Sequence, residues 1–78
     1  MKLSAIHIDS KILGGTPVFS GTRVPVETLF DYLEEDMKIE DFLKDYPSVK
    51  KSHCVKVLEL AGQIISDKNF KAKYESTS

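Results

Sequence analysis

Apolar residues recur every three or four positions in three stretches of the chain, which is the spacing of one buried helix face. Pro25 suits the first turn of a helix, where its missing N–H is not needed, and Pro47 cannot continue one. We therefore expect helices over about residues 25–36, 38–46 and 51–67, the third packing against both others. The apolar stripes are Val26, Leu29, Phe30 and Leu33; Ile39, Phe42, Leu43 and Tyr46; and Cys54, Leu58, Ala61 and Ile65.

The first part of the chain has the pattern of short strands instead. Residues 6–8 alternate apolar and polar side chains, as a half-buried strand does. The Gly14–Gly15 pair is a strong loop signal, and the apolar residues 17–19 that follow suit an edge strand because Pro17 cannot donate to the ladder. Residues 20–22 then turn the chain. We expect a β segment or hairpin within residues 5–20.

The second helix, the turn after it and the longer third helix have the order and lengths of a helix-turn-helix. The predicted fold is therefore mainly α: a short N-terminal β segment followed by three helices, the last two forming that motif. This single domain spans residues 1–67, and residues 68–78 form a basic tail.

Basic residues cluster at the start of the third helix, the part of a helix-turn-helix that meets the major groove. Two adjacent lysines there oppose the helix dipole, and the sequence shows no structural gain that offsets this. Phosphates of DNA would compensate for the unfavourable charge. The predicted DNA-binding residues are Lys50, Lys51 and Lys56 at phosphates, and Ser52 and His53 at base edges.

Composition narrows the function classes further. The chain has 78 residues, of which 41% are hydrophobic and 29% charged, typical of one globular domain rather than a disordered segment. Its first residues lack the apolar stretch of a signal peptide, no run is apolar enough to span a membrane, and one cysteine cannot form an internal disulfide, so we expect a cytoplasmic protein without a signal peptide. With too few histidines and cysteines for a usual zinc site, we expect no metal or cofactor. A domain this small that has neither a disulfide nor a structural metal is expected to form a homodimer.

Charge is unevenly distributed although the net charge is only −1. Residues 1–46 carry five cationic side chains and nine carboxylates, a net charge of −4, whereas residues 47–78 carry six lysines and three carboxylates, a net charge of +3. The basic tail interleaves aromatic residues with lysines and is predicted either to extend the third helix or to fold on a partner. Its candidate partner-binding residues are Phe70, Lys71 and Tyr74.

We expect no enzymatic activity. Cys54 lies on the apolar stripe of the third helix, which favours a buried small hydrophobe over a nucleophile. His53, its neighbour in sequence, points to another helix face and cannot serve as its base. Thr22 and Arg23 follow a glycine and are expected either to bind an anion or to anchor the turn, and Arg23 is equally suited to pairing with a carboxylate.

The string from Ile12 to Val26, with Gly14-Gly15-Thr16-Pro17-Val18 and Gly21-Thr22-Arg23, resembles the signature of the family catalogued as domain of unknown function 433. The resemblance continues through residues 37–43 and 46–49 and ends near residue 62. Two positions depart from it: Ser10 stands where the family usually has proline, and Lys50 stands where it tends to have a hydroxyl cap.

This resemblance implies a homeodomain-like or winged-helix-like fold and the antitoxin half of a type II toxin–antitoxin pair. Such an antitoxin binds the double-stranded DNA of its own operator and masks a toxin similar to PIN-type ribonucleases. The alternative is a protein-interaction adaptor whose apolar third helix meets a partner without any role for DNA.

Overall fold

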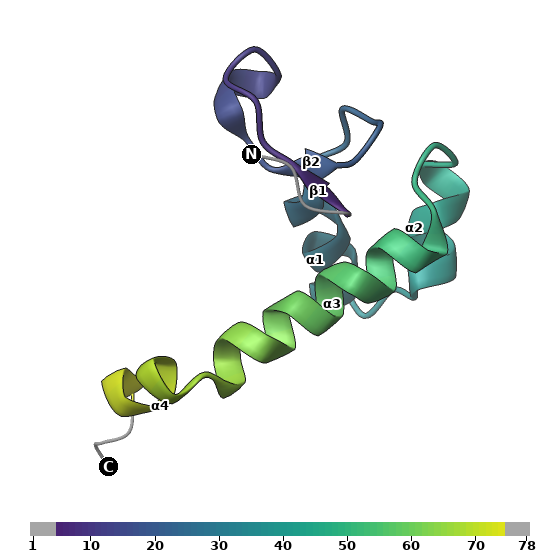
Figure 1. Ribbon diagram of the computed structural model, residues 1–78. Coiled ribbons are helices and arrows are strands. Elements are labelled where there is room, and N and C mark those ends of the chain that lie inside the picture. The colour runs from purple at the N-terminus through teal and green to yellow at the C-terminus, as the bar shows by residue number, and fades with distance from the viewer. Residues whose placement is uncertain (1–4, 75–78) are drawn as a thin grey trace.

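The computed structural model describes residues 5–74, which form a mainly helical fold with a small two-stranded sheet at its N-terminal end (Figure 1). Strands β1 (Ile6–His7) and β2 (Val18–Phe19) pair antiparallel, Ile6 opposite Phe19 and His7 opposite Val18. The helices are α1 (Val26–Glu34), α2 (Ile39–Asp45), α3 (Lys51–Ser66) and α4 (Lys68–Tyr74). The predicted β segment and mainly helical class are confirmed.

The loop between the strands uses glycine for its backbone freedom. It contains one 3-10 turn (Leu13–Gly15), in which Gly14 has φ 65° and Gly15 φ 92°. A side chain is strained at such left-handed angles, so glycine is the residue of choice there. Thr16 closes the turn by donating its hydroxyl to the Leu13 carbonyl at 2.8 Å. The glycine pair therefore has the turn role that its sequence indicates.

Helix α1 ends two residues earlier than the periodicity predicts, and the reason is a C-terminal cap. Asp36 has φ 63°, a left-handed conformation that aspartate tolerates better than most side chains. The Asp36 N–H donates to the Leu33 carbonyl at 3.1 Å, and the Met37 N–H donates to the Tyr32 carbonyl at 3.0 Å. These two bonds form a Schellman motif, which closes the helix and turns the chain towards α2.

The core lies where α1, α2 and the first half of α3 meet the sheet. Its centre is Phe42, fully buried, whose ring lies 5.7 Å from that of Phe19, 5.4 Å from that of Tyr32 and 5.1 Å from that of Tyr46. Edge-on and tilted contacts of this kind add to the stabilisation from burial alone. The buried residues are Ala5, Val18, Phe19, Val26, Leu29, Phe42, Val49, Cys54 and Val57.

Tyr32 also makes a polar contact at the edge of this cluster, and the contact predicts a pH dependence. Its hydroxyl donates to Asp45 Oδ2 at 2.6 Å, and this hydrogen bond, with some desolvation, raises the pKa of Tyr32 to about 12. An unfolded tyrosine ionises near pH 10, so the stabilisation is complete below about pH 10 and is lost as the pH rises towards about 12.

We therefore expect the difference in melting temperature between the wild type and Tyr32→Phe to shrink as the pH rises through that window. Thermal unfolding at about pH 9 and about pH 12 measures it. The comparison with Tyr32→Phe is the control, because any other effect of high pH acts on both proteins. A difference that stays constant between the two pH values would show that the Tyr32–Asp45 bond does not contribute.

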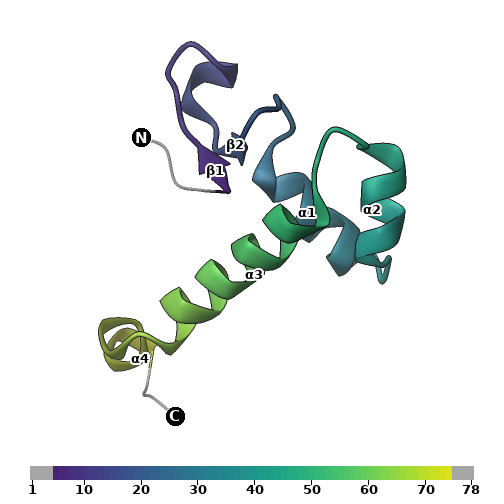
Figure 2. The same cartoon turned by 45° about the vertical axis from the view of Figure 1, so that its right-hand side comes forward.

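The second half of α3 leaves the core. Figures 1 and 2 both show that it projects from the other elements and carries α4 at its far end. Cys54 on the expected apolar stripe is fully buried, but Ile65 is 58% exposed, and its neighbour Ile64 is 62% exposed. The apolar stripe of α3 is therefore exposed beyond Ala61, because the shorter helices α1 and α2 do not extend that far.

The basic tail forms a separate helix over the described residues 68–74. At Asp67 the backbone leaves the helical region (φ −65°, ψ 143°). Its carboxylate accepts a hydrogen bond from the Asn69 N–H at 2.7 Å, and its carbonyl accepts the Lys71 N–H at 3.0 Å. Asp67 thus ends α3 and caps the N-terminus of α4.

We expect Asp67→Ala to destabilise α4 by about 1 kcal/mol, the usual worth of an aspartate cap. Hydrogen exchange of the α4 amides should accelerate several-fold while amides in the first half of α3 stay unchanged. Ser66→Ala is the matched control, since it removes a hydroxyl one residue earlier. Equal exchange rates in the wild type and Asp67→Ala would contradict the capping role.

Candidate nucleic-acid interface

The start of α3 presents a set of basic and polar side chains to solvent. Lys50 is the N-cap residue of α3, and its side chain makes no capping hydrogen bond. Lys50, Lys51, Ser52 and Lys56 are exposed, and His53 is half-buried. The helix begins here because the Lys50 carbonyl accepts the N–H groups of His53 and Cys54, at 3.0 and 3.2 Å. All five predicted DNA-binding residues therefore lie within the first two turns of one helix.

Two of the three lysines have carboxylate partners. Lys51 Nζ lies 3.3 Å from Glu40 Oε2, an exposed pair that ties the start of α3 to α2. The pKa of Glu40 lies below its usual value because its own backbone N–H and then Lys51 donate to the carboxylate. The expectation that these lysines lack structural compensation is thus wrong for Lys51. Eleven residues separate the pair, so only the packing of α2 on α3 reveals it.

Lys56 Nζ lies 3.6 Å from Glu59 Oε1, one helical turn away, whereas Lys50 forms no ion pair with another residue in the range 5–74. Exposed pairs of this kind are worth about 0–1 kcal/mol and are screened by salt. Lys51 and Lys56 can therefore exchange a carboxylate for a phosphate at small cost. The basic start of α3 remains able to bind a polyanion.

Cys54 and the histidines form no catalytic arrangement within the described part of the chain. Cys54 is fully buried, and burial raises the pKa of its thiol, which disfavours the nucleophilic thiolate. His7 Nε2 lies 3.9 Å from Asp9 Oδ2, and its buried Nδ1 has no hydrogen-bond partner among residues 5–74. Over the same residues no three histidine, cysteine, aspartate or glutamate side chains gather as metal ligands do.

Thr22 and Arg23 have different surroundings. Gly21 has φ 79°, and the Thr22 hydroxyl donates to the Phe19 carbonyl at 2.8 Å and accepts the Val24 N–H at 3.0 Å. Thr22 therefore anchors the turn that leads into α1. Arg23 is exposed, and its side chain forms no ion pair or hydrogen bond with another described residue.

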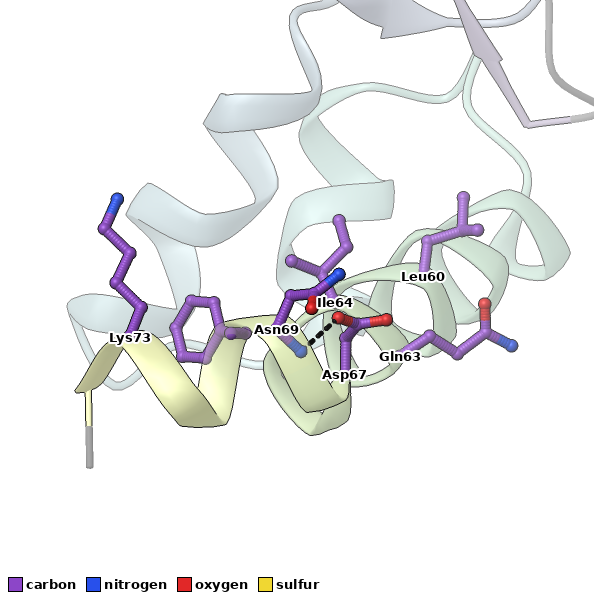
Figure 3. Close-up of a pocket in the computed structure, with 7 residues that line it drawn as sticks. Leu60, Gln63, Ile64, Asp67, Asn69 and Lys73 are labelled. Atoms are coloured by element: carbon purple, nitrogen blue, oxygen red, sulfur yellow. Dashed lines mark hydrogen bonds between the residues drawn. The ribbon is translucent and has the colours of Figure 1, made fainter.

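The predicted partner-binding residues lie on α4, next to a groove that the sequence did not indicate. The rings of Phe70 and Tyr74 lie 4.6 Å apart, and Lys73 Nζ is 5.7 Å from the centre of the Tyr74 ring. The angle between α3 and α4 creates a groove of about 490 Å³ on one side of this pair (Figure 3). It is lined by Leu60, Gln63, Ile64, Asp67, Asn69, Phe70 and Lys73. On the other side, Ile65, Phe70, Lys71 and Tyr74 line a second hollow.

A further groove of about 490 Å³ lies at the opposite end of the molecule, between α1 and the residues before β2. Its apolar surface comes from Pro17, Val26 and Phe30, and two carboxylates, Glu27 and Glu34, line it as well. Phe30 belongs to the apolar stripe of α1 but is only half-buried. The apolar stripe of α1 therefore extends beyond the part of the helix that the core buries.

No helix among residues 5–74 is long and apolar enough to cross a membrane. In comparisons with known proteins, no curated protein and no solved structure matches this chain. Residues 6–61 match the family described as "Protein of unknown function (DUF433)", and this range contains both strands, α1, α2 and most of α3. The chain belongs to the DUF433 family.

Proposed function

We propose that this protein is a DNA-binding antitoxin, which represses its own operon and masks a ribonuclease toxin similar to PIN-type enzymes. In this proposal α2, the connection 46–50 and α3 act as a helix-turn-helix of homeodomain-like or winged-helix-like type. The protein catalyses no reaction and needs no cofactor.

The observation that carries the DNA-binding part is the exposed cationic start of α3, which directly follows a short helix. Lys50, Lys51 and Lys56 are assigned to phosphates, and Ser52 and His53 to base edges. Helix N-termini favour anions through their free N–H groups, and here the lysines add positive charge to the same place. Carboxylates at Glu40 and Glu59 hold two of these side chains near the helix until DNA competes for them.

A homodimer would present two such helices to successive major-groove faces about 34 Å apart. The protein-binding part of the proposal rests on the exposed end of α3 and on α4. Ile64 and Ile65 are more than half exposed although both are strongly apolar. A toxin covering Leu60 and Ile64 in the groove beside α3 would remove part of this apolar surface from water.

Fluorescence anisotropy of the purified protein tests the DNA-binding part, with its own upstream DNA and a scrambled duplex at about 50 and 200 mM salt. We expect tighter binding to the upstream DNA and an affinity that falls steeply as salt rises. Equal, weak binding to both duplexes would contradict the proposal.

That result would favour the second candidate, a protein-interaction adaptor. The exposed apolar end of α3 is the observation behind it, because this surface needs a protein partner and no DNA. The gene next to this one discriminates further: a small nuclease supports the antitoxin, and an unrelated gene counts against it.

A further inference from the structure

α4 and the end of α3 form an arm that ends in an aromatic pair with lysines beside it. Ile65, Phe70 and Tyr74 line one hollow of the arm together with Lys71, and Lys68 lies one helical turn before Lys71. Neither lysine forms an ion pair with another residue in the range 5–74. Lys71 therefore adds positive charge to the apolar side of the arm, and Lys68 extends this charge along the neighbouring hollow, which Lys71 also lines.

The α1 groove has the complementary properties. Pro17, Val26 and Phe30 give it an apolar surface, and Glu27 and Glu34 lie along it, two helical turns apart. Neither glutamate forms an ion pair within the described residues. These two carboxylates belong to an acidic stretch: residues 26–45 carry eight carboxylates and two lysines.

The arm cannot reach the groove of its own chain. Figures 1 and 2 both place α4 at the far end of α3, whereas the groove lies beside β2 and the start of α1. A straight helix joins the core to the arm up to Ser66 and holds the two sites apart. In a second copy of the chain, however, the groove is free to accept the arm.

We propose that two copies of this chain form a reciprocal dimer, in which the arm of each copy docks into the α1 groove of the other. Phe70 and Tyr74 cover the apolar surface of Pro17, Val26 and Phe30. Lys68 and Lys71 lie against Glu27 and Glu34. Because both contacts are the same by twofold symmetry, the dimer closes on itself and does not polymerise.

Charge reversal tests this pairing directly. The variant Lys68→Glu/Lys71→Glu has an acidic arm and an acidic groove, and the variant Glu27→Lys/Glu34→Lys has a basic arm and a basic groove. Each should be monomeric, with a dimer dissociation constant raised at least tenfold over that of the wild type. Mixed in equal amounts, they should form a one-to-one heterodimer, because each acidic element then meets a basic one.

Sedimentation velocity of the full chain at about 5 to 200 µM measures the masses, and circular dichroism checks that each variant is folded. Lys11→Glu/Lys44→Glu is the control for net charge and should dimerise as the wild type does. The proposal is overturned if the wild type is monomeric at the highest concentration, if each reversed variant dimerises alone, or if the mixture stays monomeric. None of these changes lies at the start of α3, so a failure of this dimer to form is distinguishable from a failure of the DNA-binding surface itself.

Discussion

Phe42→Ala should unfold most of the protein at room temperature. Phe42 is fully buried and contacts the rings of Phe19, Tyr32 and Tyr46 at once, so its removal leaves a cavity at the point where α1, α2 and the sheet meet. Truncating a buried phenylalanine to alanine lowers the free energy of unfolding by about 3–5 kcal/mol. A domain of this size has about 3–5 kcal/mol of stability from its core, so the whole margin is lost.

Urea unfolding followed by circular dichroism measures this change. Phe42→Leu is the milder substitution at the same position, because leucine keeps most of the side-chain volume. It should lower the free energy of unfolding by less than about 1.5–2 kcal/mol. If Phe42→Ala kept a midpoint close to that of the wild type, Phe42 would not be the centre of the core.

The second large effect is expected at the start of α3. Lys50→Gln/Lys51→Gln should lower the affinity for the upstream DNA on the order of 10- to 100-fold at moderate salt, because two phosphate contacts and their counterion release are lost. The slope of log affinity against log salt should flatten by about two. The helix itself should remain, since the Lys51–Glu40 pair is exposed and worth little.

Anisotropy titrations at several salt concentrations give both quantities. Lys11→Gln/Lys73→Gln is the matched control: it removes the same charge from two exposed positions far from the start of α3, and its affinity should stay within about twofold of the wild type. An unchanged salt slope in Lys50→Gln/Lys51→Gln would place the DNA surface elsewhere.

The helices of the core were predictable because their apolar residues follow a regular period and because proline and glycine punctuate the chain. The apolar stripe of α1 and the first residue of α2 could be predicted without knowledge of the fold. The β segment was predictable for the same reason, although its strands are only two residues long. Local signals of this kind are sufficient wherever neighbours in sequence are also neighbours in space.

Features that depend on contacts between distant residues were not predictable. The partner of Lys51 lies in α2, and the exposure of Ile65 depends on how far α1 and α2 extend beside α3. The end of α3 lies within one residue of its predicted end, but the sequence left open whether the tail continues this helix, and the Asp67 cap of α4 was not predicted. The two hydrogen bonds of the Thr22 hydroxyl depend on where the Phe19 carbonyl and the Val24 N–H lie in the folded turn. These outcomes depend on how the helices pack against one another, and the spacing of apolar residues in the sequence does not specify this packing.

A titration of the ¹⁵N-labelled protein with its upstream duplex shows directly whether the first two turns of α3 bind DNA. Amide resonances of residues 50–56 should shift or broaden first, before those of the sheet and of α4. Shifts confined to other elements, or none at all in the presence of excess DNA, would contradict the account.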